Sequence, residues 1–197
     1  MNRLIHFKKK HFSNVYTWML AVILIGMMLS SASCPRPTPR TGSSFNGSAK
    51  WALNIAQPLI NGFAPDAQVY SILGAHIYKD GRLPPDTGDW SFVAWSPSRN
   101  QEFQVTVLYN GSTNTSTRSR TSAPGVTGLP IPAGWVNSTV IFNATAPHRN
   151  SGAQYANLVV FNFTNFPTAP GQAVWGINFN VGPNLLVRWD GTYLGPQ

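Results

Sequence analysis

The stretch Glu102-Phe-Gln-Val-Thr-Val-Leu-Tyr109 decides the fold class of this chain of 197 residues. Its apolar residues recur at every second position from Phe103 to Tyr109, and polar residues fill most of the positions between them. Successive side chains of a strand point to opposite faces, so this pattern predicts a strand with one buried face and one solvated face. Such strands are typical of antiparallel sheets.

A helix is expected before this strand and two further strands between them. The residues from Ser48 to Gln57 carry apolar side chains at helical spacing, and Ser48 is a suitable N-cap. Pro58 lacks the backbone N–H that a helix interior needs, so we expect the helix to end or kink near Gln57. Residues 67–78 and 90–95 are short apolar segments bounded by turn signals such as Lys79-Asp-Gly81, and they predict strands.

The second half of the chain repeats this order. Asn137 is expected to cap a short helix through about Thr145, although the β-branched residues in it are poor helix formers. Residues 155–164, 173–180 and 185–189 predict three strands, and a turn signal over residues 190–195 closes the last of them. Residues 111–134 are rich first in Ser and Thr and then in Pro and Gly, so we expect a connection between the halves.

The order of a helix, a Val-Trp pair opening a strand, and a strand that ends in an Asp-Gly turn resembles PepSY-like exported lipoproteins. The residues that carry the resemblance are Val174, Trp175, Phe179, Val187, Asp190, Gly191 and Gly195, with Trp51, Gly74, Gly81 and Trp90 as their counterparts in the first half. The tandem arrangement over residues 48–110 and 137–197 is also similar in outline to the beta-lactamase inhibitor protein. The resemblance implies an α+β fold of two helix-plus-antiparallel-strand repeats, about 48–120 and 135–197, forming one sheet with helices on one face. It implies binding or inhibition through the open face of that sheet and supplies no catalytic residue.

The N-terminus predicts export. A basic segment with Arg3 and three lysines precedes twelve apolar residues and then small residues up to Ser33, which is the pattern of a secretory signal peptide. Twelve apolar residues are too few to span a bilayer, which needs about 20. An uncleaved anchor would require residues 15–32 to insert whole.

Cys34, the single cysteine, stands directly after the small residues and resembles the lipid-modified cysteine of a bacterial lipobox. The departure is Ser31, which stands where such signals usually have Leu, so ordinary cleavage after Ser33 is the alternative. We expect residues 1–33 to be the signal peptide, residues 34–47 a Pro-rich tether and residues 48–197 one domain. The expected location is outside the cytoplasmic membrane, facing the periplasm or the cell exterior and anchored by a lipid on Cys34.

The charge of the chain gives no support for nucleic-acid binding. The net charge is +8, but four of the cations lie in the predicted signal peptide, and without it 10 Lys and Arg face 6 Asp and Glu. Only 10% of the residues are charged. Among the residues after the signal, His76 and His148 are the only histidines, and neither has a metal-ligand or catalytic partner at a recognisable spacing. We therefore expect no cofactor, no metal and no enzymatic activity.

Aromatic residues are the best candidates for a binding site. Trp90 and Trp95 are five positions apart on one predicted strand, so they should point to opposite faces. Exposed aromatics on an open sheet face are frequent anchors for partners. The candidate contacts are Tyr70, Trp90, Trp95, Tyr109 and Trp175.

We expect a non-catalytic envelope protein that binds or inhibits another envelope or secreted protein. The alternative is a carbohydrate- or cell-wall-binding module that stacks the same aromatics on sugar rings. A hydrolase is a third hypothesis, and it would require an acid or a histidine buried in a cleft beside a nucleophile.

Overall fold

A computed structural model describes residues 45–120, 122–125, 128–164 and 168–197. These residues belong to one compact unit, Pro39–Gln197, which contains the whole described hydrophobic core. A unit with its own core can fold by itself, so we expect Pro39–Gln197 to fold as an independent domain. The signal peptide, Cys34 and the tether up to residue 44 lie outside the described residues. None of the described helices is long and apolar enough to cross a membrane.

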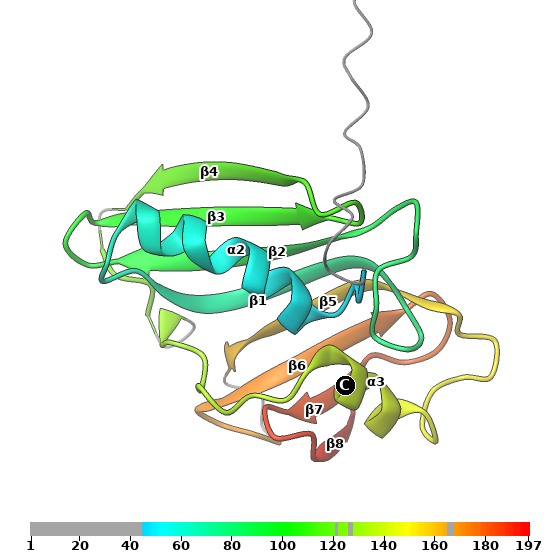
Figure 1. The fold of residues 1–197 in the computed structure, drawn as a ribbon. Coiled ribbons are helices and arrows are strands. Elements are labelled where there is room, and N and C mark those ends of the chain that lie inside the picture. Colours follow the sequence, from blue (N-terminus) through cyan, green and yellow to red (C-terminus); the bar gives the residue numbers. More distant parts are fainter. Residues whose placement is uncertain (1–44, 121, 126–127, 165–167) are drawn as a thin grey trace, which may run out of the picture. The chain divides into compact units, whose positions relative to one another are not determined.

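Eight antiparallel strands form one sheet in the order β4-β3-β2-β1-β5-β6-β7-β8, with two helices beside it in the described residues (Figure 1). The α+β class is confirmed, and the sheet is its larger part. The elements are α2 (Ala49–Phe63), β1 (Gln68–Tyr78), β2 (Asp89–Ser96), β3 (Gln101–Leu108), β4 (Thr113–Ser119), α3 (Ser138–Thr145), β5 (Tyr155–Thr164), β6 (Gln172–Phe179), β7 (Leu185–Arg188) and β8 (Tyr193–Pro196).

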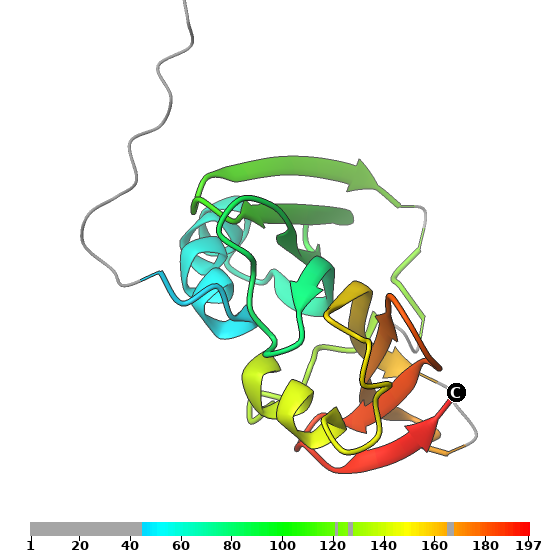
Figure 2. The ribbon, with the colours of Figure 1, turned by 90° about the vertical axis from the view of Figure 1, so that its right-hand side faces the viewer.

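The two edge strands are the elements that the sequence pattern did not predict (Figure 2). Residues 111–134 were expected to be a connection, but they contain β4, and β8 follows the turn at Asp190-Gly191. All seven side chains of β4 are exposed and polar, so neither face of this strand carries an apolar signal. Backbone pairing with β3 at every position from Thr113 to Ser119 holds it in the sheet.

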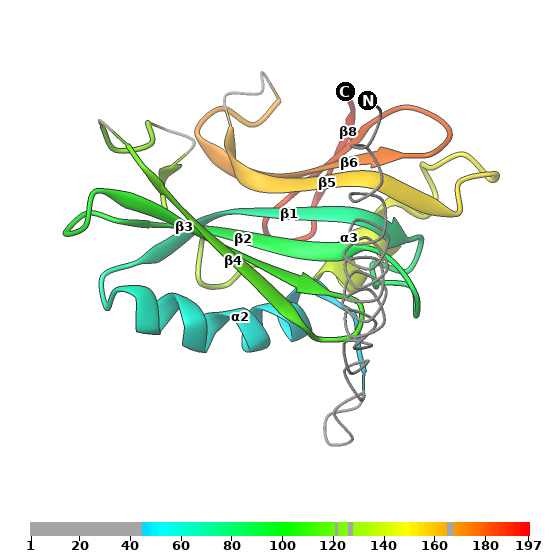
Figure 3. The same ribbon diagram turned by 90° about the horizontal axis from the view of Figure 1, so that it is seen from above.

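Helix α2 continues through Pro58 to Phe63, so the expected end of the helix near Gln57 is wrong (Figure 3). Pro58 and Asn54, whose carbonyl loses its helical donor, both lie on the exposed side of the helix where water can bond that carbonyl. On the other side Ala52, Ala56 and Ile60 are fully buried. Burial of the last turn therefore offsets the cost of the proline.

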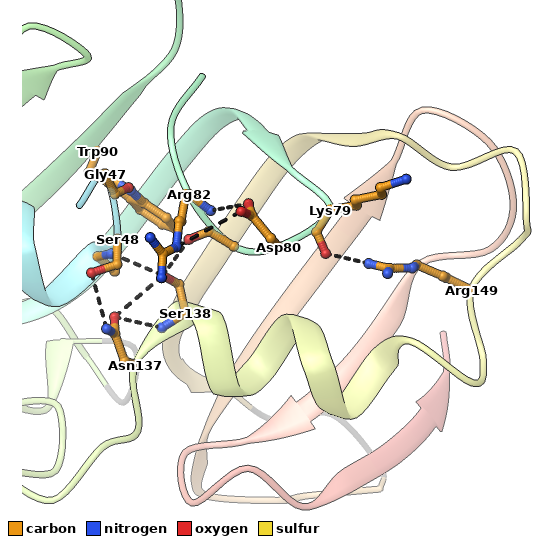
Figure 4. A network of polar contacts seen from close by, with 11 residues as sticks. Gly47, Ser48, Lys79, Asp80, Arg82, Trp90, Asn137, Ser138 and Arg149 are labelled. Atoms are coloured by element: carbon orange, nitrogen blue, oxygen red, sulfur yellow. Dashed lines mark hydrogen bonds and ion pairs between the residues drawn. The ribbon is translucent and has the colours of Figure 1, made fainter. Parts of the chain in front are cut away.

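Side chains at the N-terminus of α3 cap the N-terminus of α2 (Figure 4). Asn137, the predicted N-cap of α3, accepts from the backbone N–H of Lys50 in α2 at 3.1 Å and donates to Ser48 Oγ at 3.0 Å. Ser138 Oγ accepts from the N–H of Ala49 at 3.0 Å and donates to the carbonyl of Gly81 at 2.6 Å. Backbone donors that a helix start leaves unpaired are thus satisfied across a separation of nearly ninety residues.

One cluster of aromatic rings forms the centre of the core. The ring of Trp175 stacks on that of Phe161 at a centroid distance of 4.3 Å and meets that of Trp90 edge-on at 6.5 Å. Trp135 packs against Trp175 at 5.6 Å. Both helices add residues to this same cluster, such as Ile60 from α2 and Phe142 from α3.

Candidate binding face of the sheet

The two faces of strand β2 have different environments. Trp90, Phe92 and Ala94 belong to the core, whereas Val93 and Trp95 point to the opposite face. The prediction that Trp90 and Trp95 point to opposite faces is therefore confirmed. We call the face that carries Trp95, away from the core cluster, the outer face.

Two of the five candidate contacts are inaccessible. Trp90 and Trp175 are both 0% exposed and lie in the core. Trp90 Nε1 donates to the carbonyl of Gly47 at 3.0 Å, which ties the end of the predicted tether to the domain. The core requires these large rings, so their side chains are not available to a partner at the surface. Tyr109 is partly buried and packs against the same core cluster.

Tyr70 and Trp95 come together on the outer face around a buried carboxylate. The Tyr70 hydroxyl donates to Glu102 Oε1, and Arg120 Nε lies 2.6 Å from the same oxygen. Trp95 pairs with Glu102 in the register of β2 and β3. Tyr70, Trp95 and Glu102 are all less than 10% exposed, so this cluster offers a partner little surface.

The cluster holds Tyr70 in its neutral form. Burial, followed by the hydrogen bond to Glu102, raises the pKa of Tyr70 above its ordinary value of 10.0. A phenol that keeps its proton this firmly is a poor nucleophile and a poor proton donor. The arrangement therefore favours a structural role.

This shift predicts a loss of stability in alkali. Above pH 10 an unfolded tyrosine loses its proton while folded Tyr70 keeps it, so the stabilisation is complete below pH 10 and declines as pH rises. Denaturant unfolding at pH 8, 10 and 11 should show this decline, and Tyr70→Phe should make it shallower. An equally steep decline in Tyr70→Phe would contradict the assignment.

A groove of about 320 Å³ lies on the outer face over β5 and β6, and Asn184 and Gln197 also line it. Its floor includes one pair of opposed positions, Val160 on β5 and Gly176 on β6. A Cβ built on Gly176 would meet Val160 O and Leu186 Cδ2 only at 3.9 Å, so the missing side chain leaves the sheet hollow there. Leu158, 46% exposed, borders the groove.

The side chains along the walls of the groove are polar but uncharged. Carboxamides of Asn162, Asn178, Asn184 and Gln197 line it, and no lining side chain carries a charge. Asn178 Nδ2 donates to Asn184 Oδ1 at 2.6 Å, which fixes both amides. At one end a small cluster of Ala169, Val174 and Leu186 is buried. The arrangement can hold an apolar group on its floor and exchange hydrogen bonds with neutral polar groups at its rim.

The aromatic candidates do not include these groove residues. The sequence feature that could have indicated the groove is Gly176, which lies inside the predicted strand 173–180. A glycine within a strand often marks the close approach of another group. The surrounding asparagines gave no signal in a chain rich in this residue.

The two histidines of the domain pack against tyrosines. The ring of His76 lies 4.4 Å from that of Tyr155, and the ring of His148 stacks on that of Tyr193 at 3.8 Å. Among the described residues, no group of three His, Cys, Asp or Glu side chains is arranged to hold a metal ion.

Comparisons with known proteins give one structural match and no sequence match. The chain is similar to a "putative lipoprotein" from Clostridium difficile 630 whose crystal structure superposes with a TM-score of 0.57 over 79% of this chain and 95% of that chain. At 11% identity this likeness shows a shared fold. No family model matches the chain, and no curated protein matches it. The resemblance to PepSY-like proteins and to the beta-lactamase inhibitor protein stays a prediction.

Proposed function

We propose that this protein is a non-catalytic binding module of the cell envelope that holds or inhibits a protein partner through the outer face of its sheet. The observation that supports this most directly is the groove over Gly176, whose lining side chains carry no charge. Its apolar floor suits a hydrophobic side chain of the partner, and its carboxamides suit the peptide groups on either side of that side chain. The partner segment is therefore uncharged and extended.

The proposal includes export and a lipid anchor on Cys34. The basic and apolar N-terminal segments and the position of the single cysteine support it, as does the fold shared with the Clostridium difficile protein. It also includes the finer description of the fold as two repeats with both helices on one face. The contribution of α2 and α3 to one core cluster and the repeated order of one helix and four strands support that description.

The test fills the groove without touching the core. Gly176→Val places a side chain on the groove floor, where the nearest atoms leave ordinary van der Waals space. Gly125→Val is the matched control, because a Cβ there meets nothing within 4 Å and the residue is exposed in a loop. Immobilised Pro39–Gln197 is incubated with the envelope fraction of the source cell, and the captured protein is then purified and titrated against each variant.

We expect Gly176→Val to weaken the purified interaction at least tenfold while Gly125→Val leaves it unchanged. Equal binding by both variants would overturn the proposed site. The immobilised domain could instead retain polysaccharide or cell wall and no protein. If Gly176→Val reduced that retention, the carbohydrate-binding alternative would replace the proposal. With Trp90 and Trp175 buried, that ligand would depend on the carboxamides for its contacts.

A further inference from the structure

Strand β4 is an edge of the sheet that no other described strand covers. It has seven residues in unbroken register with β3, all exposed, and it contains neither proline nor lysine. The other edge, β8, has four residues, includes Pro196 and pairs with β7 through an irregular register. Natural sheets usually blunt their edges by short length, proline or bulges, as β8 does. The contrast singles out β4 as an edge suited to further pairing.

The unpaired backbone groups of β4 can be assigned from the hydrogen bonds at its two ends. Leu108 N–H donates to the carbonyl of Ser112 at 2.9 Å, and Arg120 N–H donates to that of Asn100 at 3.3 Å. Hydrogen-bonded pairs alternate along an antiparallel ladder, so Asn114, Ser116 and Arg118 bond β3. The N–H and C=O groups that point outward are those of Thr113, Thr115, Thr117 and Ser119.

We propose that β4 pairs with β4 of a second copy of this chain, antiparallel and centred on Ser116, joining two sheets edge to edge. In this register Thr115 opposes Thr117 of the other copy and Thr113 opposes Ser119, so every outward backbone group finds a partner, with about eight hydrogen bonds between the copies. The inference rests on β4 alone and is independent of the groove.

The side chains of β4 are compatible with their own copy in this register. The strand carries one charge, that of Arg118, and its partner across the interface is Asn114, so no like charges meet. The threonines form cross-strand pairs of β-branched residues, which stabilise sheets. A two-fold axis through Ser116 closes the assembly as a dimer. A single edge buries little surface, so the dimer is expected to be weak and to form at high local concentration.

Cysteine cross-linking tests the register directly. In the proposed dimer the two Ser116 residues form a non-hydrogen-bonded pair with Cα atoms about 4.5 Å apart, which a disulfide can bridge. The two Ser119 residues lie about 20 Å apart along the strands and cannot be bridged. Pro39–Gln197 has no cysteine, so Ser116→Cys and Ser119→Cys each provide a single exposed thiol on the same strand.

Under mild oxidation at high protein concentration we expect Ser116→Cys to form a disulfide dimer at least tenfold faster than Ser119→Cys. Adding Thr115→Pro to Ser116→Cys should abolish this advantage, because proline removes an outward N–H and spares the bonds to β3. Thr115→Val, which keeps the N–H, should preserve it. Equal rates for the two cysteine variants, or a rate that Thr115→Pro leaves unchanged in a folded domain, would overturn the proposal.

Discussion

Gly81→Ala should destabilise the domain by about 4 kcal/mol. Gly81 adopts a φ of +80°, and a Cβ at this position would lie 2.5 Å from the carbonyl oxygen of Ser138 and 2.7 Å from its carbonyl carbon. The atoms it meets are backbone, so no side-chain rotation relieves the clash. Separating the two segments would also break the buried hydrogen bond from Ser138 Oγ to the Gly81 carbonyl. Backbone strain, overpacking and a lost buried hydrogen bond each cost about 1–3 kcal/mol.

Gly171→Ala is the matched control for this prediction. Gly171 also has a positive φ, +64°, but a Cβ there meets nothing within 4 Å. Only the backbone strain of a positive φ remains, and we expect Gly171→Ala to lower the free energy of unfolding by about 1 kcal/mol. Urea unfolding of both variants measures the difference. Equal midpoints would show that contact between Gly81 and α3 does not limit stability.

Trp175→Ala should also cost about 4 kcal/mol, because it empties the centre of the core. Its indole is 0% exposed, stacks on Phe161 and meets Trp90 edge-on, so both rings would lose a contact surface. For a domain of this size the melting temperature should fall by roughly 8–16 °C. Calorimetry of the parent and the variant measures this directly.

Trp189→Ala provides the same substitution at a half-buried site. Trp189 is partly buried and packs against the edge of the core. Its removal therefore leaves a surface depression that water can fill rather than a closed cavity. We expect less than half the effect of Trp175→Ala. A Trp175→Ala variant no less stable than Trp189→Ala would contradict the assignment of Trp175 to the core.

Prediction from the sequence succeeded where one face of an element is apolar. The alternation from Phe103 to Val107 identifies β3, because these side chains enter the core and their neighbours do not. It failed for β4, whose side chains are exposed on both faces and whose place depends on backbone bonds to β3. It also gave Pro58 too much weight, because a local rule does not include the burial of Ile60 two residues later.

The candidate site was harder to predict than the fold. The sequence predicted contacts from large aromatic residues, because such residues are frequent in binding sites. Trp90 and Trp175 instead fill the core, which needs large apolar side chains. The groove arises at Gly176, where a side chain is absent, and the register that sets Gly176 opposite Val160 is not visible in the pattern of either strand. A hollow between paired strands depends on their register, which the pattern of a single strand does not contain.

The pairing of β1 with β5 has a kinetic consequence. Within each half, successive strands pair as hairpins, and such local contacts form within microseconds. Ser71 and Asn162, which oppose each other where β1 meets β5, are separated by most of the domain, so their encounter requires closure of a long loop. We therefore expect that closure to limit the rate of folding. Until it happens, β1 and β5 each present a long uncovered edge, and the time spent in that state determines how exposed the newly made chain is to aggregation.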